Sequence, residues 1–543
     1  MNSLIDTGYV PAACAPLYES VGRGRELLRL FAATADATPA EREFDLRVSA
    51  LIQNFLGSAG VSSDIRLRAL AEEFRDSSIP ADPTNADAYL DYLEERVVAH
   101  STRTASPRFI GHMTSALPYF LRPLAKLMTA LNQNVVKLET AKALSLYERQ
   151  TLAMMHRLIF DLPGEFYDRH VQSGESTLGA ITSGGTLANL TALWCARNAA
   201  LGASDGFAGV EAEGLAPALR HRGFESAVVV GSSLMHFSFD KAAGLLGLGT
   251  RNLIRVPLDR RNRIDLRALE RTLAECRERK QLVLALVGVA GTTDSGAIDP
   301  LEEMADVARR AGVHFHVDAA WGGPVLFSQR HRHKLAGIER ADSVTIDGHK
   351  QLYLPMGIGL VMLRDPRLAK VIEKQARYIV RPGSIDLGKR SLEGSRPGTV
   401  LYLHAALNII GAGGYEFLID EGIRKAQYMA RVVGERPEFE LLVEPEINIL
   451  VYRYIPEALR AKAAAGQLTA ADQTVINHFN ERLQKTQRQA GRSFVSRTSL
   501  DSTRHGSGTP TVALRVVLAN PLTTEQDIEE VLRDQVSIAA ELR

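Results

Sequence analysis

The strongest constraint on the fold is an alternation of continuous apolar runs with helical stretches between residues 170 and 365. The apolar runs are SAVVVGS, NLIRV, LVLALVGVA, VHFHV, DSVTI and GIGLVML, and the helical stretches include LANLTALWCARNAA, DLRALERTLAECRERK and PLEEMADVARRAG. Runs with so few polar interruptions are typical of strands that are buried on both faces. The alternation therefore predicts an α/β fold with a mostly parallel sheet covered by helices on both sides.

The flanking segments follow other patterns. Residues 1–105 are predicted to be helical, from the apolar spacing in RELLRLFAA and FDLRVSALIQNFLG, and to pack on a partner subunit. Residues 106–400 form the predicted large α/β domain. Residues 401–543 mix helical and strand patterns, which predicts a smaller α+β domain. Within it, the polar stretch TSLDSTRHGSGTPT is predicted to be a loop.

Composition limits the class of protein. The chain has 543 residues, more than one ordinary domain. Its 64 basic and 63 acidic residues give no global charge that would attract nucleic acid or a membrane. No apolar run reaches the length of about 18 residues that a membrane helix needs. The N-terminus lacks the order of a signal peptide, and the three cysteines are too dispersed to share a metal. These features predict a cytoplasmic enzyme.

Small residues precede one predicted helix, in AITSGGTLANL. Ser183, Gly184, Gly185 and Thr186 would let backbone N–H groups and a hydroxyl approach a phosphate at the positive end of the helix. The pattern is neither GxGxxG nor a Walker loop, which disfavours a dinucleotide or ATP. The alternative is a plain helix N-cap by Thr186.

Two further candidates stand at predicted strand ends, where α/β sheets bind ligands. His236 could stack on a planar ring, or it could be a capping or core histidine. In VHFHVDAAWGG, His314, His316 and Asp318 share one face of a strand. No metal is predicted there, because no further His or Cys stands at ligand spacing. Asp318, followed by small alanines, is expected to pair with a flat cationic ring, since a buried carboxylate needs a partner.

The stretch DSVTIDGHKQLYLPMGIGLV places a lysine directly after a predicted buried strand. An ammonium at such a position is solvated, paired or used in chemistry. Together with a phosphate cradle, a stacking histidine and a ring-pairing aspartate, Lys350 is predicted to form a Schiff base with pyridoxal 5′-phosphate. His349 is predicted to contact the phosphate or the substrate. The ordered combination supports this prediction, because each element alone is weak.

The same segments resemble the group II pyridoxal-phosphate decarboxylases, which include glutamate, aromatic amino acid and cysteine sulfinate decarboxylases. The matching stretches, in family order, are TSGGTLANLTALWCARN, HFSFDKAAGLLGLG, GVAGTTDSGAIDP, HVDAAWGG and DGHKQLYLPMGIG. Weaker likeness covers about residues 105 to 535, and the helical N-terminus is most similar to that of the bacterial pyridoxal-dependent aspartate 1-decarboxylases. The resemblance implies fold type I and a homodimer with active sites at the subunit interface.

The resemblance also implies roles that the residues alone do not define. Thr293 would contact the ring hydroxyl region, and Ala320 would pack under the ring opposite His236. Tyr378 matches the family's loop tyrosine, which would deliver a proton to the substrate. Four residues match substrate-facing positions: His112, Asn134, Arg396 and Arg515. For either arginine the alternative is a surface ion pair. DGHK replaces the NPHK of the animal enzymes, which leaves the role of Asp347 open.

These features predict the α-decarboxylation of an amino acid, with Lys350, Asp318, His236 and Tyr378 as catalytic residues. The basic residues at the substrate-facing positions exceed what one α-carboxylate requires, which favours a dicarboxylic substrate. Aspartate, giving β-alanine for pantothenate synthesis, is preferred. Glutamate, giving 4-aminobutyrate, and cysteine sulfinate are the alternatives. A pyridoxal-phosphate carbon–carbon lyase and a non-catalytic homologue remain as other classes.

Overall fold

The computed structural model describes four stretches of the chain: residues 39–81, 83–375, 384–503 and 506–542. They divide into two compact units. The smaller unit comprises the described residues of Met1–Ser58 and Glu73–Ser101, and the larger unit comprises those of Ala59–Glu72 and Thr102–Arg543. Among all described residues, no helix combines the length and apolar character that crossing a membrane requires.

The described part of the smaller unit is helical. It contains α3 (Pro39–Gly57), α5 (Ala86–Tyr92) and a π-helical turn (Leu93–Val98). Arg47 of α3 donates to Asp87 of α5 at 2.7 Å. This ion pair is partly exposed to solvent, so by itself it contributes little stability.

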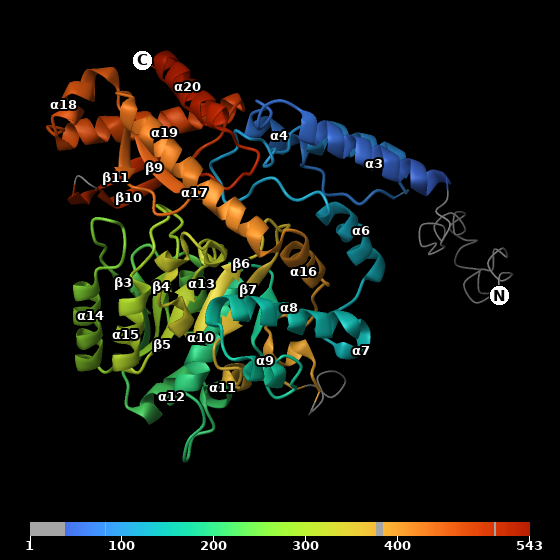
Figure 1. Ribbon diagram of the computed structural model, residues 1–543, viewed down its shortest axis with the longest axis vertical. Helices are drawn as coiled ribbons and strands as arrows, with labels where there is room; N and C mark the ends of the chain where they lie inside the picture. Colours follow the sequence, from blue (N-terminus) through green and yellow to red (C-terminus); the bar gives the residue numbers. More distant parts are fainter. Residues whose placement is uncertain (1–38, 82, 376–383, 504–505, 543) are drawn as a thin grey trace. The chain divides into compact units, whose positions relative to one another are not determined.

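The larger unit contains a seven-stranded sheet in the order β1-β7-β6-β5-β4-β2-β3 (Figure 1). Its strands are β1 (Gly179–Thr182), β2 (Ser226–Ser232), β3 (Leu253–Val256), β4 (Gln281–Val289), β5 (His314–Asp318), β6 (Ser343–Asp347) and β7 (Gly359–Leu363). Neighbouring strands from β3 to β6 are parallel, and β7 runs antiparallel to β6 and β1. The predicted α/β fold with a mostly parallel sheet is confirmed.

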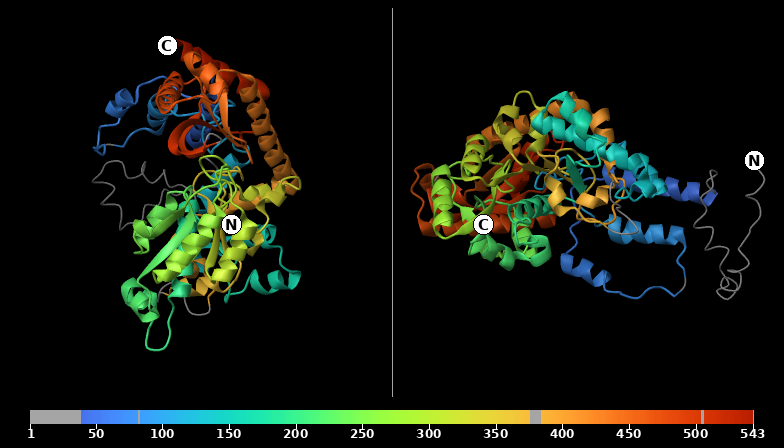
Figure 2. Two further views of the ribbon diagram at one scale, coloured as in Figure 1. Left: turned by 90° about the vertical axis from the view of Figure 1, so that its left-hand side faces the viewer. Right: turned by 90° about the horizontal axis from the view of Figure 1, so that it is seen from below.

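Helices cover both faces of this sheet because its central strands are apolar on both sides (Figure 1 and Figure 2). Along β2, Val228 joins a core cluster formed with α14 (Leu266–Glu278) and α15 (Leu301–Ala311). Its neighbour Val229 joins a cluster on the other face, formed with α10 (Gly185–Ala200). Both valines are fully buried, and each such burial contributes about 1.5–3 kcal/mol.

A second, four-stranded antiparallel sheet has the order β10-β11-β9-β8. Its strands are β8 (Phe439–Val443), β9 (Ile449–Tyr454), β10 (Ser496–Thr503) and β11 (Gly506–Val517). Helices α17 (Gly411–Glu435), α19 (Ala470–Ala490) and α20 (Glu525–Glu541) supply much of its core. The predicted domain boundaries near residues 105 and 400 stay predictions.

The stretch predicted to be a polar loop is instead part of a β-hairpin. Strand β10 pairs with β11 in a register that includes Ser496 opposite Arg515 and Leu500 opposite Thr511. Backbone hydrogen bonds to β11 stabilise this strand whatever its side chains are. The serines and threonines that suggested a loop are therefore accommodated in a sheet.

Candidate active site

A cavity of about 440 Å³ opens at the carboxyl ends of β4, β5 and β6, and their last residues Val289, Asp318 and Asp347 line it. This is the edge at which α/β sheets bind ligands. All of the residues predicted to hold a cofactor line this cavity: Ser183, Gly184, Gly185, Thr186, His236, Thr293, Asp318, Ala320, His349 and Lys350. The fold thus brings together side chains that are spread over more than 160 positions of the chain (from 183 to 350).

The glycines at the start of α10 are required by close approach of the neighbouring strands. Gly184 is the N-cap, with a φ of 146° that favours glycine, and no side chain caps the helix. A Cβ on Gly185 would lie 2.8 Å from Oδ2 of Asp347, and a Cβ on Gly359 of β7 would lie 2.5 Å from the backbone of Gly184. Thr186 is therefore not the N-cap, and the positive end of α10 faces the cavity without a side-chain partner.

Lys350 is held by an aspartate in the cavity. Its Nζ lies 3.0 Å from Oδ2 of Asp347, and Nε2 of His349 lies 3.7 Å from the same oxygen. His349 donates from Nδ1 to the carbonyl oxygen of Ile358 at 2.8 Å, which fixes its ring. Oδ1 of Asp347 is buried and has no hydrogen-bond partner among the described residues. An acceptor left unsatisfied in a cavity wall is costly, so it fits a ligand that brings a donor.

Asp318 and His236 face the cavity from two different elements. Asp318 accepts hydrogen bonds from the backbone N–H of Ala320 at 3.1 Å and from Nδ2 of Asn189 at 2.9 Å. His236 accepts at Nδ1 from the backbone N–H of Ser238, which fixes its ring where it lines the cavity. Burial lowers the pKa of His236, although Asp318 acts in the opposite direction. The imidazole is therefore neutral at pH 7.

Two residues predicted to bind the substrate lie elsewhere. The guanidinium of Arg396 donates to both carboxylate oxygens of Glu148, at 2.7 Å for one of them, and the two side chains are only 4% and 1% exposed. Oδ1 of Asn134 accepts from the backbone N–H of Arg396 at 3.1 Å. Neither residue lines the cavity. Their positions do not support the predicted substrate contacts, because Glu148 already compensates the charge of Arg396. The ion pair considered as an alternative exists, but it is buried.

Arg515 lies behind the cavity wall. It donates from Nε to Oγ of Ser496 at 2.8 Å, from Nη1 to the carbonyl oxygen of Thr293 at 2.8 Å, and from Nη2 to that of Gly111 at 3.1 Å. These bonds connect β11 to the two segments that contribute Thr293 and His112 to the cavity. Arg515 is therefore close to the site without lining it.

His112 lines the cavity as predicted, but not as a cation. Partial burial, and then the nearby charges of Arg515, Lys350 and His349, lower the pKa of His112. At pH 7 its imidazole is a neutral hydrogen-bonding group. Tyr378, the remaining predicted residue, lies outside the described residues.

Asn189 is a site residue that the motifs did not predict. It lies within α10, is 1% exposed, and donates to both Asp318 and Ser238. A signal was nevertheless present in the sequence. An asparagine inside an apolar helix is unfavourable unless its amide is bonded, and LANLTALW places one there.

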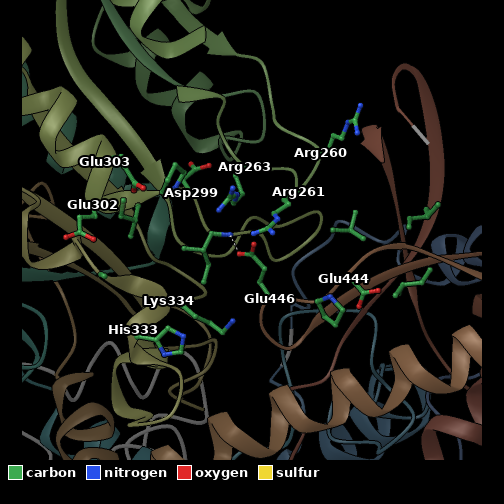
Figure 3. Close-up of a pocket in the computed structure, with 18 residues that line it drawn as sticks. Arg260, Arg261, Arg263, Asp299, Glu302, Glu303, His333, Lys334, Glu444 and Glu446 are labelled. Atoms are coloured by element: carbon green, nitrogen blue, oxygen red, sulfur yellow. Dashed lines mark hydrogen bonds between the residues drawn. The ribbon is translucent and has the colours of Figure 1, made fainter. Parts of the chain in front are cut away.

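A second cavity, of about 630 Å³, lies between the start of α15 and the segment after β8 (Figure 3). Arg261, Arg263 and Lys334 surround Glu446, which accepts from the backbone N–H of Ile298 at 2.9 Å. Acidic and basic side chains both line this second cavity. None of the residues predicted to bind the cofactor or the substrate lines it. The chemistry therefore belongs to the smaller cavity.

Comparison with known proteins agrees with this site. The family model of the pyridoxal-dependent decarboxylase conserved domain matches residues 70–455. An aspartate 1-decarboxylase of Aliivibrio fischeri is 45% identical over 95% of this chain and 94% of its own. The cysteine sulfinic acid decarboxylase of Mus musculus is 29% identical over 80% of this chain and 83% of its own. The crystal structure of mouse CSAD superposes with a TM-score of 0.79 at 25% identity, covering 92% of this chain and 99% of that one.

The chain therefore belongs to the pyridoxal-dependent decarboxylase family. It is a carboxy-lyase with the fold type I architecture, and its cofactor is pyridoxal 5′-phosphate. The residues present fit this cofactor. The uncapped start of α10 suits the phosphate, the orphan oxygen of Asp347 suits a ligand donor, and Asp318 keeps acceptor capacity toward the cavity.

Proposed function

We propose that the enzyme removes the α-carboxylate of L-aspartate and releases CO₂ and β-alanine. The observation that supports this substrate is the 45% identity to an aspartate 1-decarboxylase over 95% of the chain. Relatives named for aromatic amino acids, 2,4-diaminobutyrate or cysteine sulfinate are 28–30% identical and align over smaller shares of the chain.

We assign a role in this reaction to four of the residues that line the cavity. The bound cofactor supplies the electron sink for the pair of electrons left behind by CO₂. Lys350 is the nucleophile that anchors the cofactor, and Asp347 holds its ammonium when it is free. Asp318 would accept a hydrogen bond from the ring nitrogen of a bound cofactor and keep it protonated. His236 would pack against the ring, and as a neutral imidazole it would not repel a protonated ring.

The cavity wall favours a second carboxylate on the substrate. Arg515 is held there by neutral oxygens alone, so its positive charge is not consumed by a hydrogen-bonded carboxylate. His112 adds a neutral hydrogen-bonding group beside it. Arg515 puts one positive charge behind this end of the cavity, partly offset by the nearby Asp294 carboxylate, and this charge would attract a substrate carboxylate. Glutamate is the second candidate. Cysteine sulfinate is a further candidate, because the fold is similar to that of mouse CSAD.

A cytoplasmic homodimer is part of the same proposal. Phe237 and Met356 line the cavity and are still 57% and 66% exposed, which a second copy of the chain would cover. In the smaller unit, Leu46 and Tyr89 are exposed too, which supports packing of that segment on a partner. Buried free thiols at Cys195 and Cys276 suit a reducing compartment.

The test is to supply the cofactor-saturated enzyme with aspartate, glutamate and cysteine sulfinate in parallel and to measure CO₂ and amine products. We expect β-alanine to dominate and Lys350→Ala to abolish its formation. Dominant 4-aminobutyrate or hypotaurine would replace the proposed substrate while keeping the reaction. An aldehyde product without CO₂ would indicate a carbon–carbon lyase, and cofactor binding without any turnover would indicate a non-catalytic homologue.

A further inference from the structure

A continuous chain of buried polar side chains lies behind Asp318. Nδ2 of Asn189 donates to Oδ2 of Asp318 at 2.9 Å, and Oδ1 of Asn189 lies 3.0 Å from Nε2 of His316. Nδ1 of His316 lies 2.8 Å from Oγ of Ser343, which in turn lies 2.7 Å from Nε2 of His314. Asn189, His316 and Ser343 are essentially inaccessible to solvent.

The sheet itself aligns these groups. His314, His316 and Asp318 are alternate residues of β5, so their side chains point to the same face. Ser343 begins β6 and is the register partner of His316, which places its hydroxyl beside the imidazole. Helix α10, which packs on this sheet, supplies Asn189.

The hydrogen bonds in this chain have one possible direction. A carboxylate accepts only, so Nδ2 of Asn189 faces Asp318, and its Oδ1 must accept from Nε2–H of His316. Burial lowers the pKa of His316 to about 3, so the ring is neutral and its Nδ1 accepts the single hydroxyl proton of Ser343. Ser343 must then accept from Nε2–H of His314. Every donor therefore points toward Asp318.

The far end of the chain reaches the surface. Nδ1 of His314 lies 4.0 Å from Oδ2 of Asp342, and these side chains are 10% and 50% exposed. Asp342 also accepts from the backbone N–H of Phe315 at 2.8 Å, which fixes the carboxylate against the start of β5. At 4.0 Å the approach of His314 to Asp342 is a contact and not a hydrogen bond, so the chain of hydrogen bonds runs from Asp318 to His314 and ends there.

We propose that Ser343 and His314 are positioning residues for the cofactor: through His316 and Asn189, they fix the orientation in which Asp318 meets the ring nitrogen. Without the Ser343 hydroxyl, His316 can adopt its other tautomer and the Asn189 amide can turn over. Asp318 then keeps only the backbone N–H of Ala320 as a donor, and its orientation is no longer fixed. This inference rests on the proposed placement of the ring nitrogen at Asp318.

The test compares two hydroxyl deletions on β6 in the cofactor-loaded enzyme. Thr345 lies two residues beyond Ser343, is fully buried, and its Oγ1 has no hydrogen-bond partner among the described residues. Thr345→Val therefore removes a hydroxyl without breaking this chain, and it is the control for Ser343→Ala. The readouts are kcat, KM and the pH profile of the absorbance of the bound cofactor.

We expect Ser343→Ala to lower kcat about 10-fold with little change in KM, as for other groups that orient a site residue. The absorbance profile should shift along the pH axis, and Ser343→Thr, which keeps the hydroxyl, should restore it. Thr345→Val should match the wild type. Identical profiles and kcat for Ser343→Ala and Thr345→Val would overturn the proposal.

Two further variants make each failure distinguishable. Asp318→Asn must shift the absorbance profile, and if it does not, the proposed placement of the cofactor fails. A shift for Asp318→Asn without one for Ser343→Ala means that only the positioning inference fails. If Ser343→Ala cannot bind the cofactor, His314→Phe provides the test. A shift of the absorbance profile for His314→Phe in the direction given by Asp318→Asn, but smaller, supports the proposal. An unchanged absorbance profile for His314→Phe overturns it.

Discussion

Charged side chains near the cavity differ in what compensates them. Glu148 neutralises Arg396 inside the protein, whereas Arg515 is held by a hydroxyl and two carbonyl oxygens. Asp347 shares one oxygen with Lys350 and leaves the other without a donor. The Glu148–Arg396 pair therefore has a structural role. Arg515 keeps charge, and Asp347 keeps hydrogen-bonding capacity, for a ligand.

The buried pair of Glu148 and Arg396 gives a prediction at the scale of single residues. Glu148→Gln would leave the buried Arg396 guanidinium without its hydrogen-bonded counter-charge, which costs about 3–5 kcal/mol of unfolding free energy. Urea denaturation of the variant measures this loss, and KM for aspartate should stay unchanged.

The control is Glu435→Gln, which removes a partner from the exposed Arg431–Glu435 pair and should leave stability unaltered. A raised KM for Glu148→Gln without a loss of stability would contradict the structural role of Arg396. It would favour the substrate contact that the family position suggests.

At the scale of elements, the start of α10 can be tested through its glycine. A Cβ on Gly185 would meet the buried carboxylate of Asp347 at 2.8 Å. Gly185→Ala should therefore push the start of α10 away from Asp347. We expect the dissociation constant of the cofactor to rise about 10-fold or more, which corresponds to about 1.4 kcal/mol. Equilibrium titration of the cofactor-free protein measures this change.

Gly434→Ala is the matched helix variant, because a Cβ there has no neighbour within 4 Å. Alanine is the better helix former, so this variant should bind the cofactor normally and be more stable by up to about 1 kcal/mol. Equal cofactor affinity in both variants would show that cofactor binding at the start of α10 does not require glycine at position 185.

Strands that are stabilised by burial of their own apolar side chains were predicted from the sequence. Strands that are stabilised mainly by pairing with another strand were not. SAVVVGS corresponds to β2 (Ser226–Ser232) because an unbroken apolar run is itself the signal of a strand buried on both faces. The polar strand β10 is stabilised by pairing with β11, a partner that follows it in the chain and that its own residues do not identify. β1 (Gly179–Thr182) is too short to give a periodic pattern.

At the scale of the molecule, a closed ring of three hydrogen bonds joins the two sheets beside Lys350. Nε1 of Trp321 donates to Oδ1 of Asn448 at 3.0 Å, Nδ2 of Asn448 donates to Oε1 of Gln351 at 2.7 Å, and Nε2 of Gln351 donates to the carbonyl oxygen of Trp321 at 2.7 Å. Asn448 immediately precedes β9 of the smaller sheet. The smaller sheet therefore helps to fix the lysine loop.

Asn448→Ala should test this connection. It leaves a buried indole N–H and a buried amide oxygen unpaired, at a cost of about 1–3 kcal/mol each. We expect lower stability in urea and a reduced kcat, because Gln351 adjoins Lys350. Asn408→Ala, at an exposed position of the same unit, serves as control. Equal effects of the two variants would show that the ring of hydrogen bonds is not needed.

The acid stability of the whole molecule depends in part on a buried histidine outside the active site. Burial lowers the pKa of His156 to about 4, from 6.5 when it is unfolded. Between these pH values the unfolded chain binds the extra proton, so stability falls as the pH falls below 6.5.

His156→Gln should therefore lose about 2 kcal/mol less than the wild type between pH 7 and pH 5. Chemical denaturation at the two pH values measures the difference. His478→Gln, at a side chain that is 72% exposed, should keep the wild-type dependence. If His156→Gln behaves like His478→Gln, the imidazole is not buried as a neutral group.

The amino-acid sequence alone predicts the α/β fold and the cofactor, and the residues predicted to hold that cofactor line one cavity. Apolar periodicity is a local property of the chain, and parallel strands deliver the residues at their carboxyl ends, Asp318 among them, to one edge. The pairing of side chains, by contrast, follows from the tertiary structure. Glu148 lies 248 positions from Arg396, and Ser343 meets His316 through strand register. Such contacts depend on how distant segments pack, which no local pattern records.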